Sequence, residues 1–149
     1  MSLNNLSNIL LQNLNNHILQ VYLNKNEVEY LKKLINDRPS IFLKMSININ
    51  KIIYDNTVYL QDIPQIILII SDLYRINTIV EIIEGIDLIN IIQYTINSIL
   101  DSKLLYLQDE PDVIKILSDA SIELLRIKIS IIEKKKEEEE EMKYCCFLI

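Results

Sequence analysis

One stretch of this chain occurs twice. The segment Tyr59–Asp72 aligns without a gap on Tyr106–Asp119, with nine of fourteen positions identical and a constant offset of 47 residues. The identities include Tyr-Leu-Gln-Asp, Pro and Ser-Asp, so an isoleucine-rich composition does not explain them. A period of this length indicates a supersecondary unit that is used twice.

Each copy predicts a helix, a short loop and a second helix. Asp62 and Asp109 are the expected N-caps, because an aspartate oxygen accepts hydrogen bonds from amides two or three residues on. Pro64 and Pro111 then fall in the first turn, where the missing N–H of proline costs nothing. Gly85 is expected to end the first unit by adopting a positive φ. The second helices are therefore predicted over 63–84 and from 110 through 132, and the first helix of the second unit over 87–100.

The chain before the repeat predicts a helical hairpin. Leucines and isoleucines recur every three or four residues over 3–23, which indicates one helix. A second helix is expected from Asn26, with Glu29 completing a capping box and Arg38 before Pro39 marking its end. Residues 40–53 are expected to be helical, although two alternating isoleucines also allow a strand.

These patterns predict an all-α fold of about six helices, an N-terminal hairpin followed by two tandem helix-loop-helix units. A single domain is expected over 1–132, with repeat units near 41–85 and 87–132. A charged tail over 133–149 carries four positive and six negative side chains. It is expected either to prolong the last helix or to be disordered.

The composition argues against catalysis and against most ligands. Gly85 is the only glycine, so a glycine-rich phosphate loop is excluded. One histidine and two adjacent cysteines cannot form a zinc site. A net charge of −6 and a pI near 4.8 argue against a nucleic-acid partner. We therefore expect no catalytic residue, no metal and no cofactor; His17 and the paired carboxylates are interpreted as ordinary helix-surface groups.

Residue usage bears on source and location. Isoleucine occurs 31 times, asparagine 15 times and alanine once, which is typical of an AT-rich genome such as that of a protist or a large DNA virus. The sequence shows no signal peptide, no apolar stretch near the ~20 residues of a membrane span, and no disulfide framework. An intracellular, cytoplasmic location is expected, with the cytoplasmic face of a membrane as a further possibility.

The repeated loops resemble the EF-hand only loosely. With Asp62 as the twelfth loop position, Asn56 falls at the turn, but Lys51 and Ile53 occupy the leading ligand positions. Calcium requires six to eight oxygen ligands. The resemblance therefore implies a helix-loop-helix pair without calcium.

The chain ends Cys145-Cys146-Phe147-Leu148-Ile149, which resembles the C-a-a-X box of prenylated proteins such as Ras- and Rho-type GTPases. The resemblance implies prenylation at Cys146. Phe147 departs from the aliphatic pattern, and the GTPase phosphate loop is absent from the sequence. One lipid anchors a protein only weakly, so Cys145 is the expected palmitoylation site that would supply a second signal.

These observations predict a non-enzymatic peripheral membrane or adaptor protein, anchored through its lipidated tail. The alternative is a small soluble protein of structural or regulatory function with an unmodified tail, which self-associates through isoleucine-rich helix faces. In both cases the expected partner is a protein, either another protein or a second copy. The membrane surface is an additional partner if the tail is lipidated.

Overall fold

The computed structural model describes residues 6–15, 23–53, 55–78, 85–102 and 105–147. They form an all-α protein, which confirms the predicted fold class. The elements, in chain order, are α1 (Leu6–Asn15), α2 (Lys25–Asp37), α3 (Pro39–Ile52), β1 (Thr57–Val58), α4 (Asp62–Thr78), α5 (Leu88–Asp101), β2 (Tyr106–Leu107) and α6 (Pro111–Phe147).

The prediction that α2 starts with the capping box Asn26–Glu29 is wrong. The N-cap is Asn24, whose side chain accepts from the amide of Glu27 at 2.8 Å, while Glu27 Oε1 accepts from the amide of Asn24 at 3.0 Å. Asn26 and Glu29 have the same spacing but lie exposed on the surface. The first motif is used because Glu27 is completely buried.

The helical prediction for the segment after Pro39 is confirmed, and the alternative of a strand is wrong. Proline takes the first position of α3, where its fixed φ suits a helix start. Its buried residues include Ile41 and Phe42, Met45 three or four residues after them, and Ile49 four residues after Met45. The first helix was predicted over 3–23; α1 covers Leu6–Asn15, and residues 16–22 lie outside the described ones.

The two repeat units meet at a short parallel ladder between β1 and β2, in which Thr57 pairs with Tyr106. Because these two strands run parallel, they are not related by the two-fold axis that an antiparallel pair of loops would allow. The sequence repeat aligns Tyr106 with Tyr59, so the ladder is displaced by two residues from it. The EF-hand resemblance therefore extends only to the order of helix, loop and helix.

Two residues with positive φ build the first loop. Asp55 has a φ of 53° and Asn56 a φ of 56°, a region that aspartate and asparagine tolerate better than other side-chain-bearing residues. The carbonyl of Asn56 then accepts from the amide of Tyr106 at 2.7 Å. This turn therefore places the backbone of the first unit where it can hydrogen-bond to the second unit.

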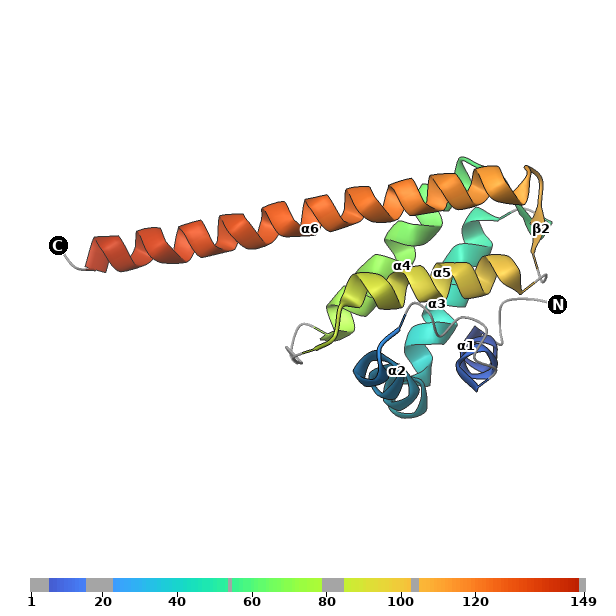
Figure 1. The fold of residues 1–149 in the computed structure, drawn as a ribbon, viewed down its shortest axis with the longest axis horizontal. Helices are drawn as coiled ribbons and strands as arrows, with labels where there is room; N and C mark the ends of the chain where they lie inside the picture. The colour runs from blue at the N-terminus through green and yellow to red at the C-terminus, as the bar shows by residue number, and fades with distance from the viewer. Residues whose placement is uncertain (1–5, 16–22, 54, 79–84, 103–104, 148–149) are drawn as a thin grey trace.

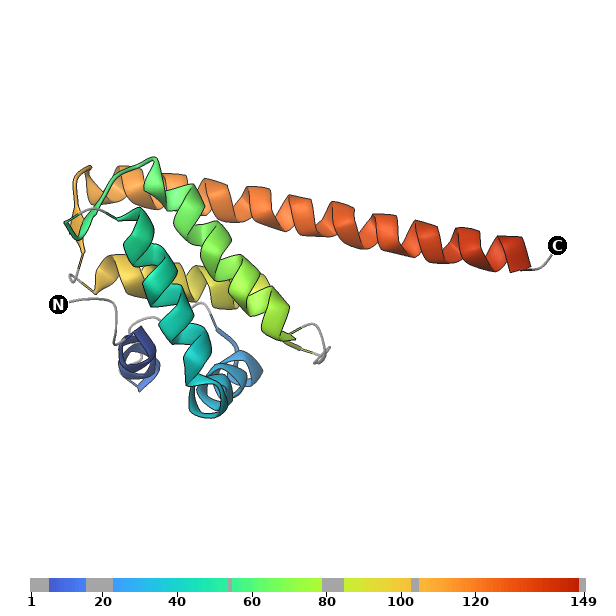
Figure 2. The ribbon, with the colours of Figure 1, turned by 180° about the vertical axis from the view of Figure 1, so that it is seen from behind.

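The core is centred on α4, which packs against α3, α5 and α6. Figures 1 and 2 show α1 and α2 on the side of the bundle away from α6. Four α4 side chains are completely buried: Ile63, Ile66, Ile70 and Tyr74. Repeated isoleucine at helical spacing thus supplies most of the apolar packing.

Helix α6 extends far beyond the bundle. It runs from Pro111 to Phe147, which at ~1.5 Å per residue is about 55 Å. Figures 1 and 2 show its C-terminal half projecting away from the other helices. Of the two expectations for the charged segment after residue 132, the prolonged helix is the one that the structure shows.

Candidate interaction surface

Asp62 and Asp109, the two aspartates of the repeat, accept hydrogen bonds from neighbouring backbone amides. Asp62 Oδ2 accepts from the amide of Tyr59 at 2.9 Å, and Asp109 Oδ2 accepts from the amide of Leu60 at 3.3 Å. Both of these acceptors reach back to the chain before α4. Asp109 therefore joins the second unit to the first.

The remaining predicted structural residues lie at helix ends or in a turn. Pro64 is in the first turn of α4 and Pro111 is the first residue of α6. Gly85 has a φ of +83°, and a Cβ there would lie 2.9 Å from Asn26 Nδ2. The predicted helix end at residue 84 lies outside the described residues.

A buried carboxylate ties α2 to α5, and no sequence pattern pointed to it. Glu27 Oε2 accepts from the amide of Asp87 at 2.8 Å, and Asn24 Nδ2 donates to the carbonyl of Gly85 at 3.0 Å. Asp87 in turn caps α5 by accepting from the amide of Ile89. Because its oxygens are occupied by backbone donors, Glu27 acts as a structural group.

Asp87, the N-cap of α5, also connects α5 to α6. Arg126 Nη1 lies 2.9 Å from Asp87 Oδ2, with both side chains about two-fifths exposed. An ion pair this exposed contributes at most about 1 kcal/mol. It positions α6 over the start of α5 more than it stabilises the fold.

Two buried tyrosines complete the polar interior. The hydroxyl of Tyr74 lies 2.7 Å from Thr95 Oγ1, and the hydroxyl of Tyr94 donates to the carbonyl of Leu10 at 2.8 Å. Burial raises the pKa of both phenols, that of Tyr94 to about 12. Tyrosine hydroxyls therefore hold α4 to α5 and α5 to α1.

These pKa shifts predict alkaline destabilisation. Tyr94 stays neutral in the folded protein when its unfolded-state phenol, with a pKa near 10, begins to ionise. Its contribution is complete below pH 10 and is lost as the pH rises toward 12, by about 1.4 kcal/mol at pH 11. Urea unfolding should show that the free energy of unfolding falls less between pH 9 and pH 11 for Tyr94→Phe than for wild type. Tyr106→Phe, at an exposed position, should retain the wild-type dependence; equal losses for wild type and Tyr94→Phe would contradict the assignment.

An apolar groove of about 320 Å³ lies between α4 and α6. Its walls are Pro64, Ile67 and Leu68 from α4 and Leu117, Ser121, Leu124, Leu125 and Lys128 from α6. Lys128 is the only residue among these that carries a charge. The lining favours an apolar chain or side chain as occupant over a polar small molecule.

The duplication explains why this side of α6 is open. Ile66, Ile70 and Tyr74 of α4 are completely buried, and the repeat aligns them with Val113, Leu117 and Ser121 of α6. Val113 is 44% exposed, and the other two are half-buried. The face that the first unit buries is therefore uncovered in the second unit, as at the end of a stack of repeats.

Exposed apolar side chains continue along α6. Ile116, Leu124, Ile127 and Ile131 are each at least half exposed, and Leu68 of α4 lies beside the groove at 45%. Scattered apolar residues are normal on a surface, but a row of them along one helix is typical of an interaction site.

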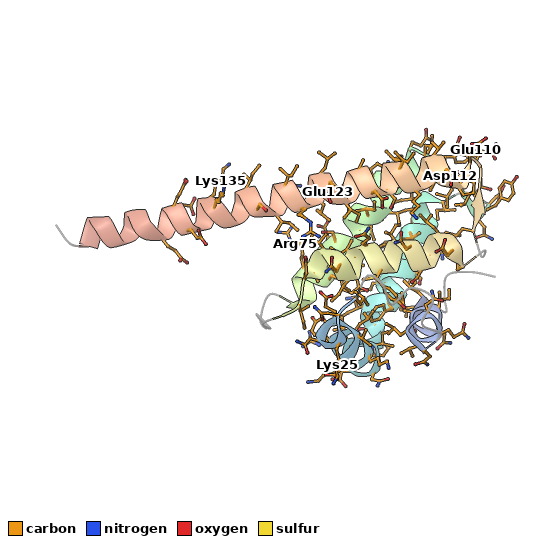
Figure 3. All side chains as sticks on the ribbon, in the orientation of Figure 1. Lys25, Arg75, Glu110, Asp112, Glu123 and Lys135 are labelled. Atoms are coloured by element: carbon orange, nitrogen blue, oxygen red, sulfur yellow. The ribbon has the colours of Figure 1, made fainter. Side chains whose placement is uncertain are left out.

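The predicted lipidation sites lie near the end of the projecting helix. Cys145 and Cys146 fall within α6, whose last residue is Phe147. Lys135 already stands well outside the bundle, as Figure 3 shows.

Within the described part of the chain, no cluster of three metal-binding side chains occurs and no helix is long and apolar enough to cross a membrane. His17 lies outside the described residues.

The architecture thus defines a small all-α protein with an open terminal repeat and a long projecting helix. In comparisons with protein-family models, curated proteins and solved structures, none matches this chain.

Proposed function

We propose that this protein is a non-enzymatic, peripheral membrane adaptor whose lipidated tail holds the helical domain at a membrane. The observation that carries the proposal is the cysteine pair at the end of a helix that projects from the bundle. Prenylation of Cys146 would attach the protein, and palmitoylation of Cys145 would supply the second lipid that stable attachment requires.

The length of α6 supports this arrangement. About 15 residues separate Ile131 from Cys146, which corresponds to about 22 Å of helix. The intervening segment holds more glutamate than lysine, so it is not attracted to an anionic membrane surface. Attachment therefore depends on the lipids, and the α4–α6 groove stays available to a partner.

The membrane proposal predicts a clear fractionation result. In eukaryotic cells, wild-type protein should sediment with membranes, whereas Cys146→Ser should stay in the supernatant. Cys145→Ser should be only weakly retained, because one prenyl chain gives marginal binding. Tyr144→Ser is the matched control, since it alters the neighbouring residue outside the four-residue box and should sediment like wild type. An identical distribution of wild type and Cys146→Ser would contradict the proposal.

Self-association is the second candidate function, and the exposed apolar row of α6 favours it. Leu124, Ile127 and Ile131 are all at least half exposed. A second copy would present the same row, so a symmetric pairing would cover both at once.

A further inference from the structure

The first half of α6 carries a heptad pattern made only of apolar residues. They recur at alternate spacings of four and three residues, and we name this row the α6 seam: Val113, Leu117, Ala120, Leu124, Ile127 and Ile131. This spacing is that of the contact positions in a coiled coil. Leu117 is half-buried and the other five residues are exposed. The α6 seam is therefore a coiled-coil face that the described part of the chain leaves open.

The α6 seam points away from the bundle. The buried residues of α6 are Ile114, Ser118, Ile122 and Leu125. With 3.6 residues per turn, they lie roughly 135° around the helix from the α6 seam. Figures 1 and 2 show α6 along one edge of the bundle. A second helix therefore has room to lie along this face.

The α6 seam is long and already ordered. It spans Val113 to Ile131, which at ~1.5 Å per residue is about 27 Å of helix. Leu124 is 68%, Ile127 56% and Ile131 50% exposed, so a partner helix would remove much apolar surface from water. Because α6 is held in place by α4 and α5, association does not have to order the helix first.

The charged residues at the two ends of the α6 seam select the occupant. Glu110 lies three residues before the seam and Lys134 three residues after it, so both continue the heptad spacing. Both are exposed, and Figure 3 shows Glu110 at the start of α6. A second copy that lies antiparallel about Ile122 would place Glu110 opposite Lys134 at each end. This surface is thus complementary to itself.

The sizes of the apolar residues fit the same alignment. The two-fold axis would repeat three kinds of layer: Val113 opposite Ile131, Leu117 opposite Ile127, and Ala120 opposite Leu124. A small residue then faces a large one at the centre, as close packing of two helices requires. An antiparallel register shifted by one heptad would instead place Lys134 or Glu110 opposite an apolar residue, which is unfavourable.

A parallel copy fits less well. In register, it would place Glu110 opposite Glu110, Lys134 opposite Lys134, and Ala120 opposite Ala120, which combines like charges with a gap at the centre. The flanking residues favour it, because Glu123 would approach Lys128 of a parallel copy but Glu123 of an antiparallel copy. These flanking contacts offset the two like-charge layers of the parallel pair without filling its gap. Charge and packing together therefore favour the antiparallel orientation.

We propose that two copies of this chain associate through their α6 seams as an antiparallel pair centred on Ile122, with Glu110–Lys134 contacts at both ends. The proposal rests on self-association, the second candidate function, and specifies its surface and symmetry. The apolar layers supply the affinity. The end contacts set the orientation and the register, because exposed ion pairs add little stability.

A charge placed in the α6 seam tests the surface. Full-length protein made in bacteria, and so without a prenyl group, is measured by sedimentation equilibrium under reducing conditions. Wild type should dimerise, and Leu124→Glu should weaken dimerisation at least about a hundredfold, because the two-fold axis repeats the buried charge. Leu43→Glu makes the same change at a 52% exposed position of α3 and should dimerise like wild type. Unchanged circular dichroism would show that both variants are folded.

Charge changes test the orientation. Lys134→Glu and Glu110→Lys should each weaken dimerisation about tenfold. An equimolar mixture of the two variants should restore it, because each end then joins opposite charges. Lys115→Glu, at an exposed position of α6 outside the α6 seam, should have no effect. Glu123→Gln should strengthen an antiparallel pair by removing the Glu123–Glu123 repulsion; weaker dimerisation of this variant would contradict the orientation.

A crosslink tests the register. Val113→Cys/Ile131→Cys is made in a Cys145→Ser/Cys146→Ser background and oxidised. Peptide mass spectrometry should find a 113–131 crosslink, which must join two chains because these positions are about 27 Å apart on one helix. Only 113–113 and 131–131 crosslinks would contradict the antiparallel pairing.

The outcomes separate the surface from self-association itself. A wild-type protein that stays monomeric at the highest soluble concentration would overturn both. Dimerisation that Leu124→Glu leaves unchanged would overturn the α6 seam while self-association stands. Neither measurement depends on a lipid, so the membrane proposal is tested independently by fractionation.

Discussion

Replacing Glu27 by alanine should lower the free energy of unfolding by about 3 kcal/mol. The carboxylate is completely buried and accepts from the amides of Asn24 and Asp87. Its removal would leave both amides without these acceptors and separate the start of α2 from the start of α5. Hydrogen bonds to a charged group are worth roughly 1.5–3 kcal/mol each, which gives this estimate.

The measurement is urea unfolding followed by far-UV circular dichroism. Glu29→Ala is the matched control, since it removes the same side chain from an exposed position of α2 and should change stability by less than about 0.5 kcal/mol. Glu27→Gln should be intermediate, because one amide oxygen remains as an acceptor. Equal effects of Glu27→Ala and Glu29→Ala would contradict the structural function assigned to Glu27.

Phe42→Ala should cost about 3–5 kcal/mol, because it leaves a cavity between α3 and α4. The ring is 1% exposed and meets Tyr74 edge to face, with centroids 6.2 Å apart. The lost stability combines two terms. One is the free energy that burying the ring contributes in wild type, and the other is the cost of the cavity, which the packed isoleucines cannot fill.

Leu43→Ala is the control for this core substitution. Leu43 is the next residue of α3 but is 52% exposed, so its truncation should cost less than about 1 kcal/mol. Thermal or urea unfolding of the two variants gives the comparison. A cost for Phe42→Ala no greater than that for Leu43→Ala would contradict the packing of α3 on α4.

Local signals in the sequence predicted the helices well. Proline at position 39 marks the junction of α2 and α3, and the prediction of a helix starting near Asp87 agrees with its place as the N-cap of α5. These signals act over three or four residues, so they are visible without the fold. The capping box was misplaced because Asn24–Glu27 and Asn26–Glu29 have the same spacing, and only burial against α5 distinguishes them.

The relation between the two units could not be predicted in this way. The repeat predicted Asp62 and Asp109 as equivalent, but their acceptor oxygens meet the neighbouring amides of Tyr59 and Leu60. Such contacts depend on how the second unit lies on the first, which periodicity does not describe. The α4–α6 groove was missed for the same reason, since each of its walls reads as an ordinary helix face.

The repeat nevertheless contained a usable signal for the interaction surface. Its alignment pairs buried Ile66 and Ile70 with Val113 and Leu117, apolar residues that no third unit covers in the described structure. Apolar positions that a following unit covers in the first copy, but that have no following unit to cover them in the second copy, indicate this side of α6.

The most direct test of the membrane proposal is the intact mass of the full chain purified from eukaryotic cells. The account predicts the added mass of a thioether-linked prenyl group on wild type and its absence from Cys146→Ser. Peptide mass spectrometry should place the group on Cys146 rather than Cys145. An unmodified wild-type chain that still ends in Ile149 would contradict lipid anchoring.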